Sequence, residues 1–387
     1  MATQDLPPLL RLCQLRKARA SPLPSGAPAF ETVCLPEGMA RVQSRAFGGT
    51  MACQALQAAM QTLPPAPSPA ERWAVYSVQG NFLGPTDSHK RATYTVETLR
   101  ETRTFVTRFV VATQEFAAKR KGEPAGGRDG GGDTETRKVF SCTVDLIRRV
   151  EAAKEFPAAG PVLAFSQAPS RNYPDPAGGS VKLWVDEVEA RGKTGETSAD
   201  NVRRFKDFFK LAYEILDLKF APGSTQQQTL VGIDQDHTTS AAGVPSEQRV
   251  DADFFKSRYT IADLVRINDE VRRTPAGREV LPMDAYSLHA SLLAFWLDSL
   301  LAFLPLNHHG LHARDTTANS TLDFSLRFHN DDLDVDQWHV RELRSWCADR
   351  TRHFAESRVY DQRGRLVCSE SQQCISRLKE NGRAPKL

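Results

Sequence analysis

The 387-residue sequence lacks the features that would place it at once in several common classes. Its seven cysteines include no pair spaced C-x-x-C, which argues against a zinc site or a disulfide framework and fits a reducing compartment. No stretch approaches the roughly twenty uninterrupted apolar residues of a spanning helix, so we expect no membrane span. The formal net charge is only +3, with basic residues scattered among acidic ones, so we expect no nucleic-acid partner.

Signals for export, serine hydrolysis and metal binding are missing as well. The N-terminus has no apolar segment of the kind that a secretory signal needs, so we do not expect secretion. No Gly-x-Ser-x-Gly motif occurs, which disfavours a serine hydrolase of the α/β type. His308, His309 and His312 have no matching carboxylate or cysteine nearby, so a polar loop explains them better than a metal site. We therefore expect neither a metal nor a cofactor.

The composition and the C-terminus bear on where the protein works. Hydrophobic residues make up 40% and charged residues 25% of the chain, which is typical of a soluble globular protein. The last three residues, Pro385-Lys386-Leu387, are an imperfect version of the Ser-Lys-Leu-like tripeptide that directs peroxisomal import. They predict a peroxisomal location, or a cytoplasmic one if the tail carries no signal.

Two portions of the chain repeat one order of elements. The first reads as a helix over 48–60, a strand over 75–83 that ends in an acidic turn, and three further β-rich runs. The second reads as a helix over about 287–303, a strand over 321–329 with an acidic turn, and consecutive strands. This repetition predicts two copies of one α+β unit, each an antiparallel sheet that covers one helix.

Polar and glycine-rich segments set the expected domain limits. We predict an N-terminal domain over 1–170, a linker or insertion over 171–250 and a C-terminal domain over 251–387. A glycine-rich insertion is expected near 119–137, because that composition cannot supply a core. In the linker, apolar residues recur along one helical face, which predicts one amphipathic helix over 201–218 after a cap at Ser198 or Asp200.

Asp298 is the most unusual position in the sequence. It falls in the second predicted helix, which is apolar nearly all round and therefore expected to lie inside its sheet. Burying a carboxylate there costs on the order of several kcal/mol unless it is hydrogen-bonded or protonated. Burial also raises the pKa of a carboxyl. Asp298 is thus a candidate catalytic base. The alternative is that it faces solvent at the edge of the helix beside Ser299.

Thr321 and Gln372 are weaker candidates when each is taken alone. Thr321 begins an alternating strand, which is typical of an ordinary half-buried strand, and Gln372 lies among polar neighbours near the end of the chain. Simple alternation puts Thr321 and Phe324 on opposite faces. Both can line one pocket only if a bulge or a sheet edge intervenes.

Taken together, the chain resembles the acyl-CoA thioesterase II family, which includes bacterial thioesterase II and the peroxisomal acyl-CoA thioesterases. The resemblance runs in the right order through most of residues 40–145 and 282–377. The matching stretches are Ala46-Phe47-Gly48-Gly49, 81–87 (NFLGPTD), 94–108 (YTVETLRETRTFVTR), 321–329 (TLDFSLRFH) and 360–372 (YDQRGRLVCSESQ).

The resemblance implies an α+β tandem hotdog fold and hydrolysis of acyl-CoA to free acid and coenzyme A. The family's catalytic Asp, hydroxyl residue and Gln match Asp298, Thr321 and Gln372, which would hold a water against the thioester carbonyl. The resemblance also allows a homo-oligomer formed through the hotdog sheets. The predicted substrate-binding residues are Gly48, Gly49, Phe82, Phe324 and Trp296.

Departures from the family pattern leave alternatives open. Phe324 and Gln79 stand where the family usually has His, and the region between the copies is unusually long. A specialised acyl group, presented by CoA or by a carrier protein, fits these changes. Other readings are a hotdog dehydratase or hydratase, for which the helix offers only His289, and a non-catalytic acyl-binding subunit.

Overall fold

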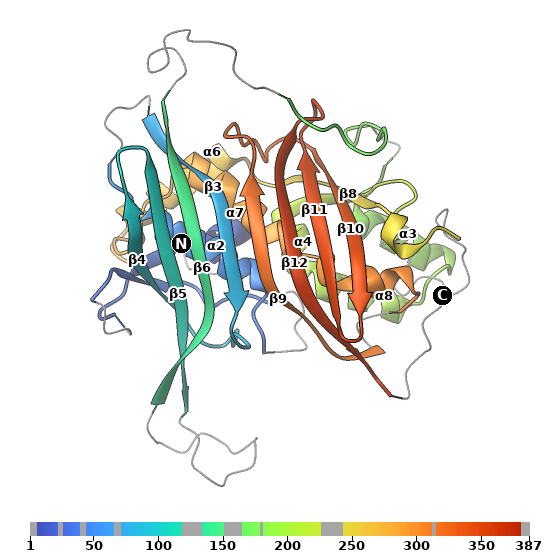
Figure 1. Ribbon diagram of the computed structural model, residues 1–387, viewed down its shortest axis with the longest axis horizontal. Coiled ribbons are helices and arrows are strands. Elements are labelled where there is room, and N and C mark those ends of the chain that lie inside the picture. Colours follow the sequence, from blue (N-terminus) through green and yellow to red (C-terminus); the bar gives the residue numbers. More distant parts are fainter. Residues whose placement is uncertain are drawn as a thin grey trace.

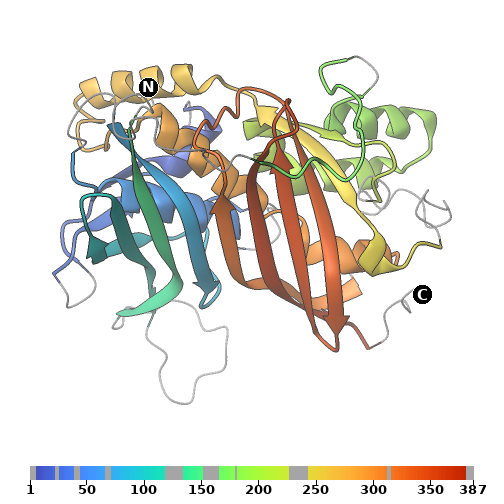
Figure 2. The same cartoon turned by 45° about the horizontal axis from the view of Figure 1, so that its top comes forward.

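A computed structural model describes residues 6–21, 26–38, 44–65, 71–117, 134–150, 165–178, 181–225, 243–311 and 315–380. These residues form one antiparallel 12-stranded sheet in the order β1-β2-β4-β5-β6-β3-β9-β12-β11-β10-β8-β7. The helices lie against one face of this sheet (Figures 1 and 2). The predicted C-terminal tripeptide, residue His312 and most of the glycine-rich insertion fall outside the described residues.

The first copy supplies one half of the sheet and one central helix. The helix α2 spans Gly48–Met60, as the sequence predicts, and small residues on all sides let it lie deep in the core. The strand predicted over 75–83 begins earlier, at Glu71, because residues 71–74 also pair with β6 and bury Trp73 and Ala74. The strand bounds of this copy are β1 Leu15–Lys17, β2 Ala29–Thr32, β3 Glu71–Phe82, β4 Thr93–Glu101, β5 Phe105–Ala117 and β6 Thr134–Val150.

The second copy repeats this arrangement around α7, Ala285–Leu297. The sheet order β9-β12-β11-β10-β8 of this copy corresponds, strand by strand, to β3-β6-β5-β4-β2 of the first. Central pairing of β3 with β9 joins the two halves, and α2 packs beside α7 behind that seam. The strand bounds are β7 Leu216–Phe220, β8 Asp251–Ser257, β9 Thr316–Phe328, β10 His339–Asp349, β11 Arg352–Tyr360 and β12 Leu366–Leu378.

The segment between the copies is more structured than the sequence predicts. The expected amphipathic helix is α4, Ala199–Ile215, and the Ser198 hydroxyl accepts a hydrogen bond from the Asn201 N–H at 3.1 Å as its cap. A second helix, α3 (Trp184–Thr194), precedes it. Trp184 stacks on Phe220 with ring centroids 4.4 Å apart and reaches Trp296 of α7 at 5.9 Å. These aromatic contacts dock the segment onto the second copy.

The remaining helices close the molecule around this core. The N-terminal α1 (Pro8–Cys13) is almost wholly buried and packs on α2. The others are α6 Ile261–Arg273, the short α8 Leu304–His308 and 3-10 helices at Ser246–Gln248 and Leu301–Phe303. The stretch Ala285–His308 is long and apolar enough to cross a membrane, yet 89% of its most apolar window is buried inside the protein. Its hydrophobicity is therefore that of a core element.

The second central helix ends earlier than predicted. It stops at Leu297, so Asp298 is the C-terminal cap residue and does not lie within the helix. Leu300 then adopts a left-handed conformation with φ of 75°, which breaks the helix before Leu301–Phe303. Neither Gly nor Pro marks this end, so the continuous apolar run hides it in the sequence.

Candidate active site

A buried arginine holds the end of α7 in place. The Arg341 guanidinium on β10 donates to the carbonyl oxygens of Trp296 at 2.9 Å and Ser299 at 3.2 Å. It also pairs with the Asp253 carboxylate on β8 at 2.6 Å. The last carbonyl groups of a helix have no partner within the helix, so their burial requires such donors. Arg341 thereby fixes the position of Asp298, which follows the last turn.

Two glycines allow α2 to meet Asp298. The Gly49 N–H donates a hydrogen bond to the Asp298 carboxylate. A Cβ on Gly48 would lie 2.5 Å from Asp298 Oδ2, and a Cβ on Gly49 would lie 2.1 Å from the Phe295 carbonyl oxygen. A side chain at Gly49 would collide with backbone, whereas one at Gly48 would displace the Asp298 carboxylate and the Phe82 ring. The positive end of the α2 dipole consequently faces the carboxylate.

A second hydrogen-bond partner of Asp298 comes from the sheet. Gln372 on β12 donates from Nε2 to Asp298 Oδ1 at 2.9 Å, and Thr321 on β9 donates from its hydroxyl to Gln372 Oε1 at 3.1 Å. The structure therefore brings Asp298, Thr321 and Gln372 together, as the sequence analysis expects. They come from the end of one helix and from two adjacent strands.

A β-bulge resolves the conflict between Thr321 and Phe324. The pairing of β12 with β9 shifts between Gln373↔Asp323 and Cys374↔Thr321, so Leu322 has no opposite residue. The extra residue reverses the alternation. Thr321 and Phe324 thus point to the same inner face, as they can only when a bulge lies between them.

Burial changes the acidity of Asp298. Removal from water raises its pKa from 3.8 to about 7, while hydrogen bonds from the Gly49 N–H, the Gln372 amide and the Thr321 hydroxyl oppose that rise. The Thr321 hydroxyl has one proton, so it donates to either Asp298 or Gln372 at a given moment. A carboxyl with a pKa near neutrality can accept a proton from water at neutral pH.

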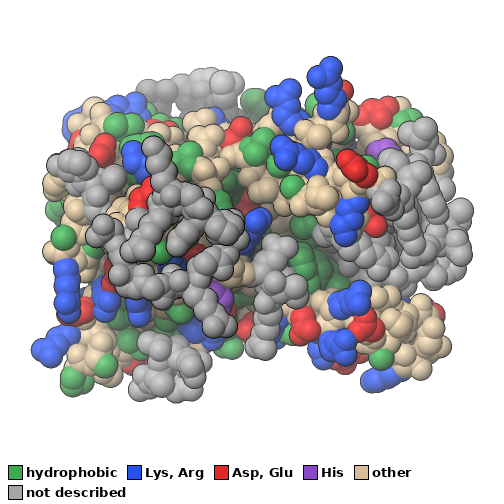
Figure 3. Space-filling model, turned by 90° about the horizontal axis from the view of Figure 1, so that it is seen from below, with side chains coloured by type: hydrophobic (Ala, Val, Ile, Leu, Met, Phe, Trp, Pro, Cys, Tyr) green, Lys and Arg blue, Asp and Glu red, His purple; other side chains and the backbone are tan. Residues whose placement is uncertain are grey.

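Asp298 and Thr321 open onto a cavity of about 410 Å³. The ends of β3 and β9 border it on the side of the molecule shown in Figure 3, where hydrophobic side chains lie in a hollow among charged surface. Both copies and the segment between them contribute to the wall. The apolar side chains of the lining are Ala46, Phe47, Met51, Phe82, Leu83, Pro85, Phe208, Phe209, Leu300, Ala302, Phe303 and Leu322.

The predicted substrate-binding residues take different places. Gly48 and Phe82 line the cavity, whereas Gly49 contributes its N–H to Asp298. Phe324 lies behind the wall, with its ring 5.8 Å from that of Phe82. Trp296 is fully buried away from the cavity, where the Arg341 guanidinium lies over its ring at 4.5 Å.

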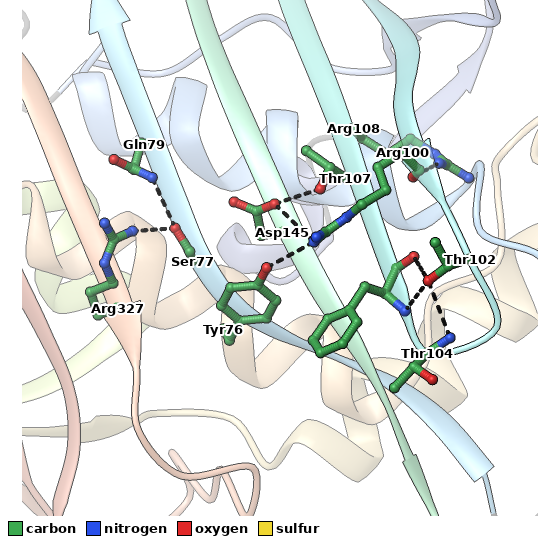
Figure 4. Close-up of polar contacts among 11 residues, drawn as sticks. Tyr76, Ser77, Gln79, Arg100, Thr102, Thr104, Thr107, Arg108, Asp145 and Arg327 are labelled. Carbon is green, nitrogen blue, oxygen red and sulfur yellow. Dashed lines mark hydrogen bonds and ion pairs between the residues drawn. The ribbon is translucent and has the colours of Figure 1, made fainter.

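Gln79 does not reach the cavity. Its side chain is exposed on the outer face of the sheet and donates to the Ser77 hydroxyl at 3.4 Å, which Arg327 of β9 also contacts (Figure 4). On the same face Arg100 donates to the Tyr76 hydroxyl at 3.1 Å. The replacement of the usual His by Gln79 therefore leaves the polarity of the cavity unchanged.

Sequence reasoning missed three contributors to this region. Phe208 comes from the segment between the copies, whose sequence carries no link to the site. Arg341 lies on β10, and nothing in the local sequence signals that an arginine there is fully buried. Glu370 could have been found, since it lies two residues before Gln372 on the same strand and therefore shares its face.

The fold and the site together define a double-hotdog protein with a buried carboxyl at the base of an apolar cavity. A family model described as the acyl-CoA thioesterase N-terminal domain matches residues 35–125, and one described as the C-terminal domain matches 270–376. The chain belongs to the acyl-CoA thioesterase family and is a thioester hydrolase of that family. No curated protein sequence matches it.

Solved structures agree on the fold. An acyl-CoA thioesterase II, TesB2, from Mycobacterium marinum is 18% identical with a TM-score of 0.56, covering 96% of this chain and 99% of that one. A tesB protein from Mycobacterium avium subs paratuberculosis is 16% identical with a TM-score of 0.51, covering 95% and 97%. A hotdog protein of unknown function from Alicyclobacillus acidocaldarius is 12% identical with a TM-score of 0.52, covering 96% and 98%. The shared feature is the double hotdog.

Proposed function

We propose that this thioesterase hydrolyses an acyl-CoA with a water molecule that Asp298, Thr321 and Gln372 hold and activate. One observation carries the proposal: a buried carboxyl, hydrogen-bonded to Gln372 at 2.9 Å, opens onto an apolar cavity. The three residue types are those that the family resemblance implies. No covalent enzyme intermediate is needed.

The proposed reaction proceeds in two steps. The water oxygen attacks the thioester carbonyl carbon while its proton passes to an oxygen of Asp298. The tetrahedral intermediate then collapses to the free acid, the carbon–sulfur bond breaks, and the departing thiolate takes the proton that Asp298 accepted, which returns Asp298 to the carboxylate and releases CoA as the thiol. The positive end of α2 favours the negative charge that develops on the carbonyl oxygen.

The apolar cavity wall favours an apolar acyl group as the buried part of the substrate. Pockets of a few hundred Å³ with apolar walls and few polar groups bind such ligands well. Arg45 is exposed at the edge of the cavity, where its charge suits the phosphates of coenzyme A. Peroxisomal or cytoplasmic location and a homo-oligomer through the sheets stay predictions from the sequence.

The geometry does not favour a dehydratase or hydratase. No histidine is among the described residues that line the cavity. The His289 side chain is turned elsewhere, where its Nδ1 accepts a hydrogen bond from the Val335 N–H at 3.1 Å.

Release of free thiol from a panel of acyl-CoAs of increasing chain length tests the proposal. We expect Asp298→Asn to lower kcat by about 1,000-fold or more, the scale of losing a general base together with its water. Asp323→Asn, which changes an exposed carboxyl on the same strand as Thr321, is the matched control. Full activity of Asp298→Asn would refute the mechanism, and binding without thiol release by the wild type would favour a non-catalytic subunit.

A further inference from the structure

A second buried carboxyl lies beside the proposed catalytic residues. Glu370 on β12 is 2% exposed and accepts a hydrogen bond from Gln372 Nε2 at 2.7 Å. The same nitrogen donates to Asp298 at 2.9 Å. One amide group therefore bridges two acids, and Glu370 has no part in the mechanism described so far.

This bridge fixes the orientation of the Gln372 amide. Its two N–H groups are used by Asp298 and Glu370, and its oxygen accepts from the Thr321 hydroxyl at 3.1 Å and lies 3.6 Å from the Cys374 thiol. Rotation of the amide by half a turn would place its oxygen against both acids. Glu370 consequently helps to hold the Gln372 N–H toward Asp298 and its oxygen toward Thr321.

The surroundings favour the neutral form of Glu370. Burial and the adjacent Asp298 carboxyl raise the pKa of Glu370 well above its usual range. Among the described residues, the cation that acts on Glu370 is Arg341, and its guanidinium already bonds Asp253 and the end of α7. The other titratable side chains facing Glu370 are Cys368 and Cys374, whose pKa values burial also raises, so both stay uncharged.

A place also exists for the proton of the neutral acid. Within the described residues, Glu370 Oε2 has no hydrogen-bond partner, and neither does the Ser357 hydroxyl. Ser357 of β11 pairs directly with Glu370 across the sheet, so both side chains project from the same face. The acid O–H can bond this hydroxyl, directly or through one water.

We propose that Glu370 is a positioning residue, a neutral carboxylic acid that accepts from Gln372 and thereby keeps the amide oriented for the water held by Asp298. This inference rests on the proposed function. It adds a fourth residue to the polar group, one that acts through Gln372 and touches neither water nor substrate.

Steady-state kinetics of Glu370→Gln and Glu370→Leu, across the pH range of the Asp298 titration, test the inference. Glu370→Leu removes the acceptor, so we expect kcat to fall about 100-fold with KM within about threefold, as for the loss of a transition-state contact. Glu370→Gln keeps an acceptor oxygen without a charge. We expect it to restore kcat to within about threefold of the wild type, with the acid limb of the pH profile unmoved.

Glu342→Leu is the matched control for removing a buried glutamate. Glu342 on β10 is 4% exposed and accepts from Ser170 and Tyr173, away from Asp298. We expect the kcat of this variant to stay within about twofold of the wild type. Infrared difference spectra should show a protonated carboxyl signal in the wild type that disappears in Glu370→Gln. This readout does not depend on turnover.

Several results would overturn the inference. If Glu370→Gln is as inactive as Glu370→Leu, the Glu370 acid itself transfers a proton. A downward move of the acid limb in Glu370→Gln would mean that Glu370 is ionised in the wild type. Unchanged kcat in Glu370→Leu would mean that Gln372 needs no support from Glu370. If Glu370→Leu fails to fold, the pH profile and the infrared spectrum of Glu370→Gln test the inference. Activity retained by Asp298→Asn would instead refute the proposed function, and the two failures are therefore distinguishable.

Discussion

Gln372 Nε2 and Asp298 Oδ1 lie 2.9 Å apart, although the two residues are 74 positions apart in the chain. The contact joins the last strand of the second copy to the end of its central helix. Gly49 of the first copy completes the set from the opposite side. The candidate site thus takes residues from both copies, which the pairing of β3 with β9 holds side by side.

The pH dependence of hydrolysis should report on Asp298. Its pKa is raised to about 7, and only the ionised carboxylate can accept a proton from water. We expect kcat/KM to be low at acid pH, to rise through an apparent pKa near 7 and to level off above it. A thiol-release assay with one acyl-CoA, repeated from acid to alkaline pH, measures this dependence of kcat/KM on pH. A midpoint near 4, the value of an exposed carboxyl, would show that Asp298 is not the base.

Gly48→Ala should disable the site without unfolding the protein. The added Cβ would lie 2.5 Å from Asp298 Oδ2 and 2.7 Å from the Phe82 ring. The carboxylate must then move, and a displacement of about 1 Å can cost about 100-fold in rate. Kinetics together with thermal unfolding distinguish lost activity from lost structure. Gly84→Ala, where the new Cβ meets nothing within 4 Å, should cost far less.

Phe208→Ala should change which acyl groups are hydrolysed. Phe208 of α4 lines the cavity and packs against Phe303 with ring centroids 6.1 Å apart. Its removal enlarges the cavity, so the ratio of kcat/KM for long over short acyl-CoAs should rise about tenfold or more. Val202→Ala on the same helix, whose side chain meets Gly192 of α3, is the control. Equal ratios in both variants would exclude α4 from substrate selection.

Arg341→Met should destabilise the protein through Asp253. Both side chains are fully buried, and removing one partner of such a pair leaves an unpaired charge. We expect the free energy of unfolding to fall by about 3–5 kcal/mol, measured by urea titration. The double variant Arg341→Met with Asp253→Leu should recover part of this loss. If the double variant is no more stable than the single one, the helix-end contacts of Arg341 dominate.

The three candidate residues carried unequal signals in the sequence. A carboxyl in an apolar run is unusual wherever it occurs, so Asp298 could be singled out before its partners were known. Thr321 and Gln372 had no such signal and depended on the family resemblance. Glu370 carried a signal in its spacing from Gln372. Phe208 carried none, because the cavity wall forms only when α4 docks through Trp184.

The sequence by itself determined the repeated α+β units, the antiparallel strands and the burial of the second helix, since these follow from periodicity and from the order of the elements. Tertiary structure alone decided the end of that helix at Leu297, the bulge at Leu322 and the approach of Gly49 to Asp298. Each of these depends on atoms from distant segments that compete for the same space and the same hydrogen bonds. The local sequence pattern does not contain this information about distant segments. The chemistry of the site depends on it.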